Sequence, residues 1–129
     1  PDIFIAKLHG NDGSVAWAVS LGSTGIDGVG DIAVDAAGHV VLAASLGGAI
    51  DGGTSAGGVD ATIASFDAAN GTAGWRKVFS TKGDDRASAV TFGRNGDIYA
   101  IVNLGDAYDF GMPVIGAASY SAVLLRIAP

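Results

Sequence analysis

The sequence contains one unit twice, and this repetition limits the possible fold more than any other feature. Shifted by 58 residues, Asp2–Gly53 aligns with Asp60–Gly111 without a gap, and about 13 of 52 paired positions are identical. Trp17 and Trp75 are the only tryptophans, and they fall in register. Chains with such a period stack copies of one supersecondary element, because each copy buries its apolar face only against a neighbour. The sequence therefore predicts an array of similar units.

A third copy of the unit begins near the end of the sequence. Ser121–Ile127 aligns with Asp60–Phe66 at a shift of 61, and the three extra residues fall around Met112-Pro113. We therefore interpret residues 1–129 as a single partial array, whose copies span 2–59, 60–120 and 121–127.

The composition favours strands and tight turns over helices. All 13 acidic residues are Asp, and Glu and Gln do not occur, so most strong helix formers other than Ala and Leu are scarce. The 21 glycines, together with Asp and Asn, suit turns because they tolerate positive φ or bond to their own backbone. We expect an all-β chain.

Each copy reads as four short strands. Val40–Leu46 is apolar on both faces, which is typical of a strand buried on both sides. The expected strands, given as first and second copy, are Ile3–Leu8 and Ala61–Phe66, Val15–Leu21 and Gly74–Ser80, Gly30–Asp35 and Ser88–Gly93, and Val40–Leu46 and Ile98–Leu104.

Glycines at fixed places in the repeat predict the hairpins. Asn95-Gly96 is a strong signal for a type I′ turn, which needs positive φ at both central residues, and Gly38 takes the same place in the first copy. Gly13 and Gly71 close the other turn of each copy. Antiparallel four-stranded units at this period are typical of propeller blades.

The second copy resembles a known family. Asp60–Asp67 (Asp-Ala-x-Ile-Ala-x-Phe-Asp), Asn70-Gly71, Trp75 and Gly83–Ala87 together resemble the bacterial β-propeller repeats often called SBBP repeats. The resemblance implies a propeller of large, exported or surface-attached bacterial proteins, generally without assigned activity. The first copy departs from the pattern, because Ile26-Asp27-Gly28 stands where an acidic pair and Arg are typical.

The resemblance also implies an order of strands within the blades. In such propellers the strand before the Asx-Gly hairpin is the innermost, so the chain reads as two strands, one complete blade over Gly30–Ser80, and three strands: about two blades plus one strand. Rings use about four to eight blades. The expected partners are therefore the remaining blades of a longer chain, or copies of this chain joined through edge strands.

The tryptophans resemble a second pattern. The segment from Ser65 to Trp75, with Asn70-Gly71 inside it, is similar to the tryptophan-docking repeat of quinoprotein propellers, although Asn70 and Thr72 replace the usual Thr or Lys. In that family Trp and Gly lock adjacent blades and do not touch the cofactor. The likeness implies a structural role for Trp17 and Trp75.

Charge and apolar patterning disfavour two classes of partner. A net charge of −6 repels phosphate backbones, so we expect no nucleic acid. No run of about 18 apolar residues occurs, so we expect no membrane span. Without cysteine there are no disulfides or thiolate metal sites.

Candidate catalytic patterns have plain explanations. Gly53–Gly57 fits the G-x-S-x-G elbow, but no helix is expected after it and the second copy lacks the serine. His9 and His39 lie at expected turns, in non-equivalent positions, and nothing places a serine and an acid beside them. We assign no catalytic or cofactor-binding residue. Asn70-Gly71-Thr72 also matches a glycosylation sequon.

Calcium is the one metal that the aspartates suggest. The candidate ligands are Asp27, Asp31 and Asp85, since calcium prefers clustered oxygen ligands. No EF-hand or nonapeptide calcium pattern occurs. Asp27 and Asp85 recur in register, as residues that stabilise turns through side-chain hydrogen bonds also would.

The expected function is that of a non-enzymatic structural or binding scaffold, secreted or at the bacterial cell surface, with loops as its recognition surface. The alternatives are an enzyme of the hydrolase or quinoprotein kind with a site on the ring axis, and a carbohydrate-binding propeller. Fold alone does not choose among them.

Overall fold

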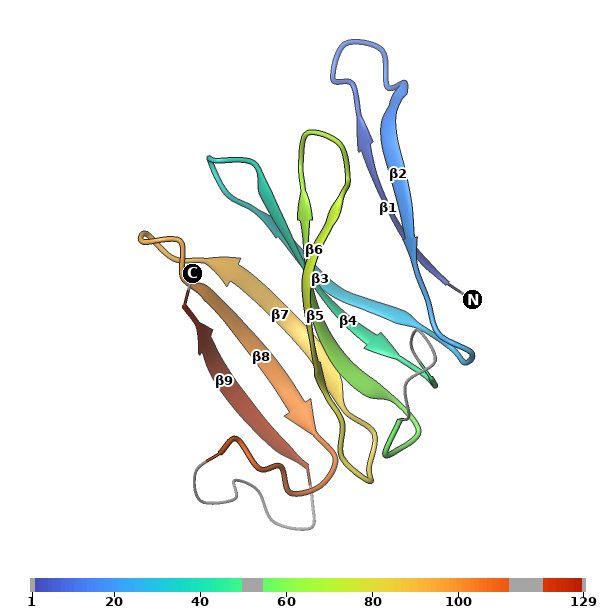
Figure 1. The fold of residues 1–129 in the computed structure, drawn as a ribbon, viewed down its shortest axis with the longest axis vertical. Helices are drawn as coiled ribbons and strands as arrows, with labels where there is room; N and C mark the ends of the chain where they lie inside the picture. The colour runs from blue at the N-terminus through green and yellow to red at the C-terminus, as the bar shows by residue number, and fades with distance from the viewer. Residues whose placement is uncertain (1, 50–54, 112–119, 129) are drawn as a thin grey trace.

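The structure is a computed structural model that describes residues 2–49, 55–111 and 120–128. Figure 1 shows an all-β chain. In these residues there is no helix, and so none that is long and apolar enough to cross a membrane. The nine strands are β1 (Ile3–Leu8), β2 (Val15–Leu21), β3 (Gly28–Val34), β4 (His39–Leu46), β5 (Asp60–Asp67), β6 (Ala73–Phe79), β7 (Arg86–Phe92), β8 (Ile98–Leu104) and β9 (Ser121–Ile127).

The strands form three antiparallel sheets in chain order. The first holds β1-β2, the second β3-β4-β5-β6 and the third β7-β8-β9. Among the described residues each strand pairs only with its sequence neighbours, as expected when hairpin turns join consecutive strands. The expected grouping of one four-stranded sheet between two partial sheets is confirmed.

A β-bulge shifts the start of the first strand in both later sheets. The expected strands began at Gly30 and Ser88, whereas β3 and β7 begin two residues earlier, at Gly28 and Arg86. The register of pairing shifts between Val29 and Asp31, and again between Ala87 and Ala89. A bulge adds one unpaired residue and lets pairing resume beyond it. The β-bulge is therefore part of the repeat, because it occurs at equivalent positions of β3 and β7.

The two tight hairpins share one geometry, which differs from the expected type I′ turn. Gly38 N–H donates to Asp35 O at 3.2 Å, and Gly96 N–H donates to Gly93 O at 3.3 Å. The glycines have φ of 88° and 78°. One i-to-i+3 bond followed by a left-handed glycine is the pattern of a three-residue hairpin with a bulge. Glycine is required in both hairpins, as predicted. It is required at the bulge position that follows the turn, and not at the two central residues of a type I′ turn.

The inner strands β4 and β5 of the central sheet are buried on both faces, because a neighbouring sheet packs against each. On one side Ile3 and Ile5 of β1 lie in a cluster with Leu42, Leu46 and Phe66. On the other side the third sheet contributes residues such as Val90, Val102 and Leu104 to a cluster with Val41 and Ile63. Alternate side chains of a strand point to opposite faces. β4 is accordingly buried from Val40 to Leu46, as its apolar run predicted.

The second and third sheets meet most closely through their first strands. Asp31 Oδ2 on β3 accepts a hydrogen bond from Val90 N–H on β7 at 3.0 Å. A Cβ added to Gly30 would lie 2.1 Å from the carbonyl oxygen of Ala87. Only glycine permits this approach of two backbones.

Candidate functional site

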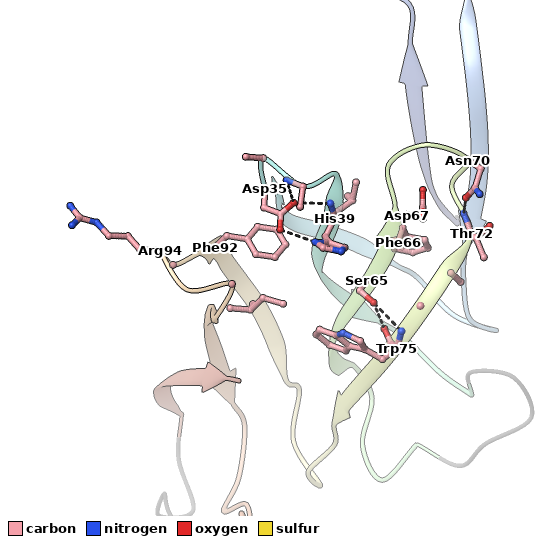
Figure 2. A pocket seen from close by; sticks show the side chains of 18 residues that line it. Asp35, His39, Ser65, Phe66, Asp67, Asn70, Thr72, Trp75, Phe92 and Arg94 are labelled. Carbon is pink, nitrogen blue, oxygen red and sulfur yellow. Dashed lines mark hydrogen bonds and ion pairs between the residues drawn. The ribbon is translucent and has the colours of Figure 1, made fainter. Parts of the chain in front are cut away.

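A hollow of about 870 Å³ opens between the second and third sheets, at the end where their hairpins lie (Figure 2). Trp75 of β6 lines it on one side, and Phe92 and Arg94 of the β7–β8 hairpin line it on another. The labelled residues around it are Asp35, His39, Ser65, Phe66, Asp67, Asn70, Thr72, Trp75, Phe92 and Arg94. It is the candidate functional site.

Trp17 shows what a tryptophan of this repeat does when its neighbouring sheet is complete. Its indole Nε1 donates to the carbonyl oxygen of Ala68 at 3.1 Å, and Lys7 Nζ donates to the same oxygen at 2.9 Å. Its ring lies against the β5–β6 turn so closely that a Cβ on Gly71 would be 2.7 Å from Cε3. Gly71 has φ of 75°. The side chain therefore locks the first sheet to a turn of the second.

Trp75, the repeat equivalent of Trp17, has a different environment. It lines the hollow and is 41% exposed. Its backbone is held by Ser65, whose hydroxyl accepts from Trp75 N–H at 2.9 Å and donates to Trp75 O at 3.3 Å. In the described residues, the third sheet has no fourth strand and so presents no turn like the one that packs on Trp17.

Asp35 and His39 form an ion pair at the edge of the hollow. His39 Nδ1 lies 2.8 Å from Asp35 Oδ2, and the backbone N–H of His39 donates to Asp35 Oδ1 at 2.8 Å. The side-chain hydrogen bond and the charge of Asp35 raise the pKa of His39 above 6.5. The hydrogen bonds from His39 hold the pKa of Asp35 below 3.8. The sequence indicated that both residues lie at a turn, but the ion pair between them was not predicted. Its signal is that Asp35 and His39 are four residues apart, on either side of the hairpin loop.

The pair stabilises the β3–β4 hairpin, and no nucleophile is aligned with it among the described residues. Asp35 Oδ1 also accepts from Ala37 N–H at 2.9 Å, which completes the turn. The hydroxyl of Ser65, the serine that lines the hollow, is bonded to the backbone of Trp75 instead. A serine mechanism requires that hydroxyl to bond to the histidine.

The calcium candidates Asp27 and Asp85 serve one structural purpose in the two copies. Asp85 is fully buried and accepts from Thr81 Oγ1 at 2.8 Å and from Gly105 N–H at 2.7 Å. Asp27 accepts from Ser23 Oγ and, at 3.1 Å, from Gly47 N–H. Each carboxylate thus ties the loop before the first strand of a sheet to the loop after the second.

Burial raises the pKa of Asp27, but the hydrogen bonds from Ser23 and Gly47 outweigh it and hold the pKa below 3.8. The third candidate, Asp31, accepts a hydrogen bond from the backbone of β7 at Val90. Across residues 2–49, 55–111 and 120–128, no group of three His, Cys, Asp or Glu side chains is placed to hold a metal ion.

The remaining sequence candidates lie in turns. Ser55 Oγ donates to Gly57 O at 2.6 Å, and the next element is strand β5, so the strand–turn–helix of a nucleophile elbow is not formed there. Gly53 and Thr54, like the Met112-Pro113 loop, lie outside the described residues. The His9 backbone closes the β1–β2 turn by accepting from Gly13 N–H at 2.8 Å. In the sequon, Asn70 Oδ1 accepts from Thr72 N–H at 2.9 Å.

Comparison with known proteins identifies no family for this chain. No protein-family model matches it, and no curated protein is significantly similar to it. Its function is therefore argued from the repeat and from the geometry of the stacked sheets.

Proposed function

We propose that the three sheets are one complete and two partial blades of a β-propeller, and that the chain serves as a structural or binding scaffold of an exported or surface-attached bacterial protein. The observation that carries this proposal is the close approach of β3 and β7. These strands occupy the same place in their sheets, and Asp31 of one bonds directly to the backbone of the other. Blades arranged around an axis bring their innermost strands together in this way.

Exposed apolar side chains on β3 support an array of more sheets than these three. Val29, Ile32 and Val34 are 58%, 47% and 60% exposed. Their equivalents on β7 are covered, with Ala87 2% and Val90 5% exposed and Phe92 packed against the same core. β7 packs against β3, β4 and β5 of the complete second sheet, whereas the first sheet has only two strands among the described residues. We expect a complete preceding sheet to cover these side chains of β3 as well.

The hydrogen bonding of the polar groups near the hollow supports the scaffold role. Asp35, His39 and Ser65 stabilise turns and strand edges through local hydrogen bonds. Rigid sheets of this kind present their hairpins as a recognition surface. The hairpins at the hollow are the surface that we assign to binding.

The shape of a tandem protein tests the arrangement. Residues 28–85 are one repeat length with all four strands of the central sheet, so they can be joined end to end in four to eight copies. If the sheets are propeller blades, a tandem protein with one particular number of copies should close into a ring. That protein should appear as a compact disc in small-angle scattering and show a sharp rise in thermal stability, because closure removes the exposed sheet faces. A rod that lengthens with every added copy would contradict the proposal and indicate a solenoid.

A further inference from the structure

We propose that Trp75 and the outer edge of β9 form a docking site for a polypeptide segment of the repeat's own type, consisting of a glycine turn followed by a β-strand. The segment lies outside residues 1–129. Its strand pairs antiparallel with β9. Its turn contains a glycine of positive φ, and the main-chain carbonyl three residues before that glycine accepts a hydrogen bond from the indole of Trp75. This inference deepens the scaffold function proposed above and rests on it.

The occupied site within the chain supplies the template. β5 is paired on both sides, with β4 and with β6, and the turn between β5 and β6 carries Ala68 and Gly71. Trp17 of the preceding sheet binds that turn through one hydrogen bond and one close ring contact. The same turn therefore both continues the sheet, through the pairing of β5 with β6, and binds the tryptophan of the preceding sheet.

The site at Trp75 has the same parts, apart from the segment itself. β9 aligns with β5 and pairs with β8 alone, so it is an edge strand of its sheet among the described residues. Ile127 at the end of β9 pairs with Ile98, and both Ile98 and Trp75 line the hollow. A turn that follows a strand in the position of β9 would therefore enter the hollow beside Trp75. The hollow is the space that the β5–β6 turn fills in the preceding pair of sheets.

A second copy of this chain fits the site less well. Its β1–β2 turn has the required glycine, because Gly13 has φ of 73° and nothing within 4 Å of an added Cβ. The strand after that turn, β2, is already paired with β1, so β1 would have to take the place of β9. Displacing β9 would uncover Val123, Leu125 and Ile127, which pack on the core. A segment that adds a single strand beside β9 leaves β9 in place, so these contacts with the core remain.

A grafted chain tests the site at high effective concentration. Residues 67–80 are joined directly after Ile127, in place of Ala128 and Pro129, with the grafted tryptophan changed to phenylalanine. We expect hydrogen exchange of the Trp75 indole N–H to slow at least tenfold and the amides of β9 to gain protection, while the Trp17 indole is unchanged. The matched control carries a Gly71→Val change within the grafted copy only, which blocks the ring contact and should leave Trp75 exchanging as in the unaltered chain.

Two outcomes would overturn the inference. One is an unchanged exchange rate at Trp75 in a folded graft, or an equal slowing with the valine control. The other is an unaltered chain that light scattering finds to be a dimer with Trp75 already protected, which would make a second copy the occupant.

If the graft does not fold, the same segment is added as an unlabelled peptide to the unaltered, nitrogen-15-labelled chain. Of the two indole resonances, that of Trp75 alone is then expected to shift, together with amide resonances of β9, and no shift at millimolar peptide contradicts the site. Failure here, together with a disc-shaped tandem protein, would exclude the docking site and leave the scaffold proposal standing.

Discussion

The indole N–H of Trp17 donates to the main-chain oxygen of Ala68 at 3.1 Å, across an interface between two sheets and 51 residues of sequence. Lys7 donates to the same oxygen, and the Trp17 ring covers Gly71. The contact is built from a main-chain carbonyl and a residue without a side chain, so it depends on the shape of the turn. Such a contact requires no particular side chain on the turn beyond the glycine.

The two turn glycines separate the effect of backbone strain from that of the interface. Gly71→Ala and Gly13→Ala place alanine at nearly equal φ, 75° and 73°, which costs about 1–2 kcal/mol at either position. At Gly71 the new Cβ also meets the Trp17 ring, whereas at Gly13 it meets nothing within 4 Å. Urea unfolding should show Gly71→Ala to be less stable than Gly13→Ala by about a further 1–3 kcal/mol. Equal losses would show that the Trp17 contact does not constrain the turn.

The two tryptophans should differ in their contribution to stability. Trp17→Phe removes the hydrogen bond to Ala68 and should lower the free energy of unfolding by about 1 kcal/mol. Trp75→Phe changes a side chain that is 41% exposed, and its effect should stay within about 0.5 kcal/mol. The midpoints of urea unfolding measure both. A larger loss at Trp75 would indicate that its site is occupied in the isolated chain.

Asp85 and Asp27 have the same hydrogen-bond pattern at different depths. Asp85→Asn places amide hydrogens against the donors Thr81 and Gly105 in a fully buried position and should destabilise the chain by about 3 kcal/mol. Asp27→Asn should cost about 1 kcal/mol because Asp27 is only partly buried. Thermal or urea unfolding gives both values. Calcium should leave the unfolding midpoint of the unaltered chain unchanged, and a rise that Asp85→Asn abolishes would argue for a metal at this loop.

The Asp35–His39 pair should be visible in the titration of His39. Its folded pKa is raised above 6.5, so its contribution to stability is present below pH 6.5 and is lost as pH rises through the folded pKa. The lowered pKa of Asp35 gives a contribution that is present above 3.8 and lost as pH falls. Nuclear magnetic resonance should find the His39 midpoint above 6.5, and near 6.5 in Asp35→Asn. An unchanged midpoint in that variant would exclude the ion pair.

Thr62 offers a stabilising change. Its side chain is fully buried on β5, and its hydroxyl oxygen has no hydrogen-bond partner in the part of the chain that the structure describes. Thr62→Val keeps the shape and removes the unpaired polar atom, so the free energy of unfolding should rise by about 1 kcal/mol. Thr62→Ser keeps the hydroxyl, removes a methyl group and should destabilise. A loss of stability in Thr62→Val would indicate a partner for the hydroxyl, such as a buried water.

Local features of this chain could be read from its sequence because they depend on residues close in the chain. The strands β1, β2 and β8 have the bounds that alternation and turn residues predicted, and β4 is buried on both sides as its apolar run indicated. The bulges were missed because Ser88 carries no bulge signal and Gly30 was taken as the first residue of its strand, although a glycine within a strand is typical of a bulge. At Gly30 the cause lies in β7, whose backbone approaches too closely for a side chain.

The sequence by itself determined the repeat, the all-β class and the positions of the glycine turns, since strand periodicity and turn chemistry are local properties. The grouping of strands into one complete and two partial sheets was implied by the resemblance to propeller repeats. Only the tertiary structure decided that Asp31 binds β7, that Asp85 is buried, and that Trp17 is docked while Trp75 faces a hollow. These outcomes depend on which sheet lies in front of each residue. Identical residues in the repeat therefore differ in environment because the sheets around them differ in their number of strands.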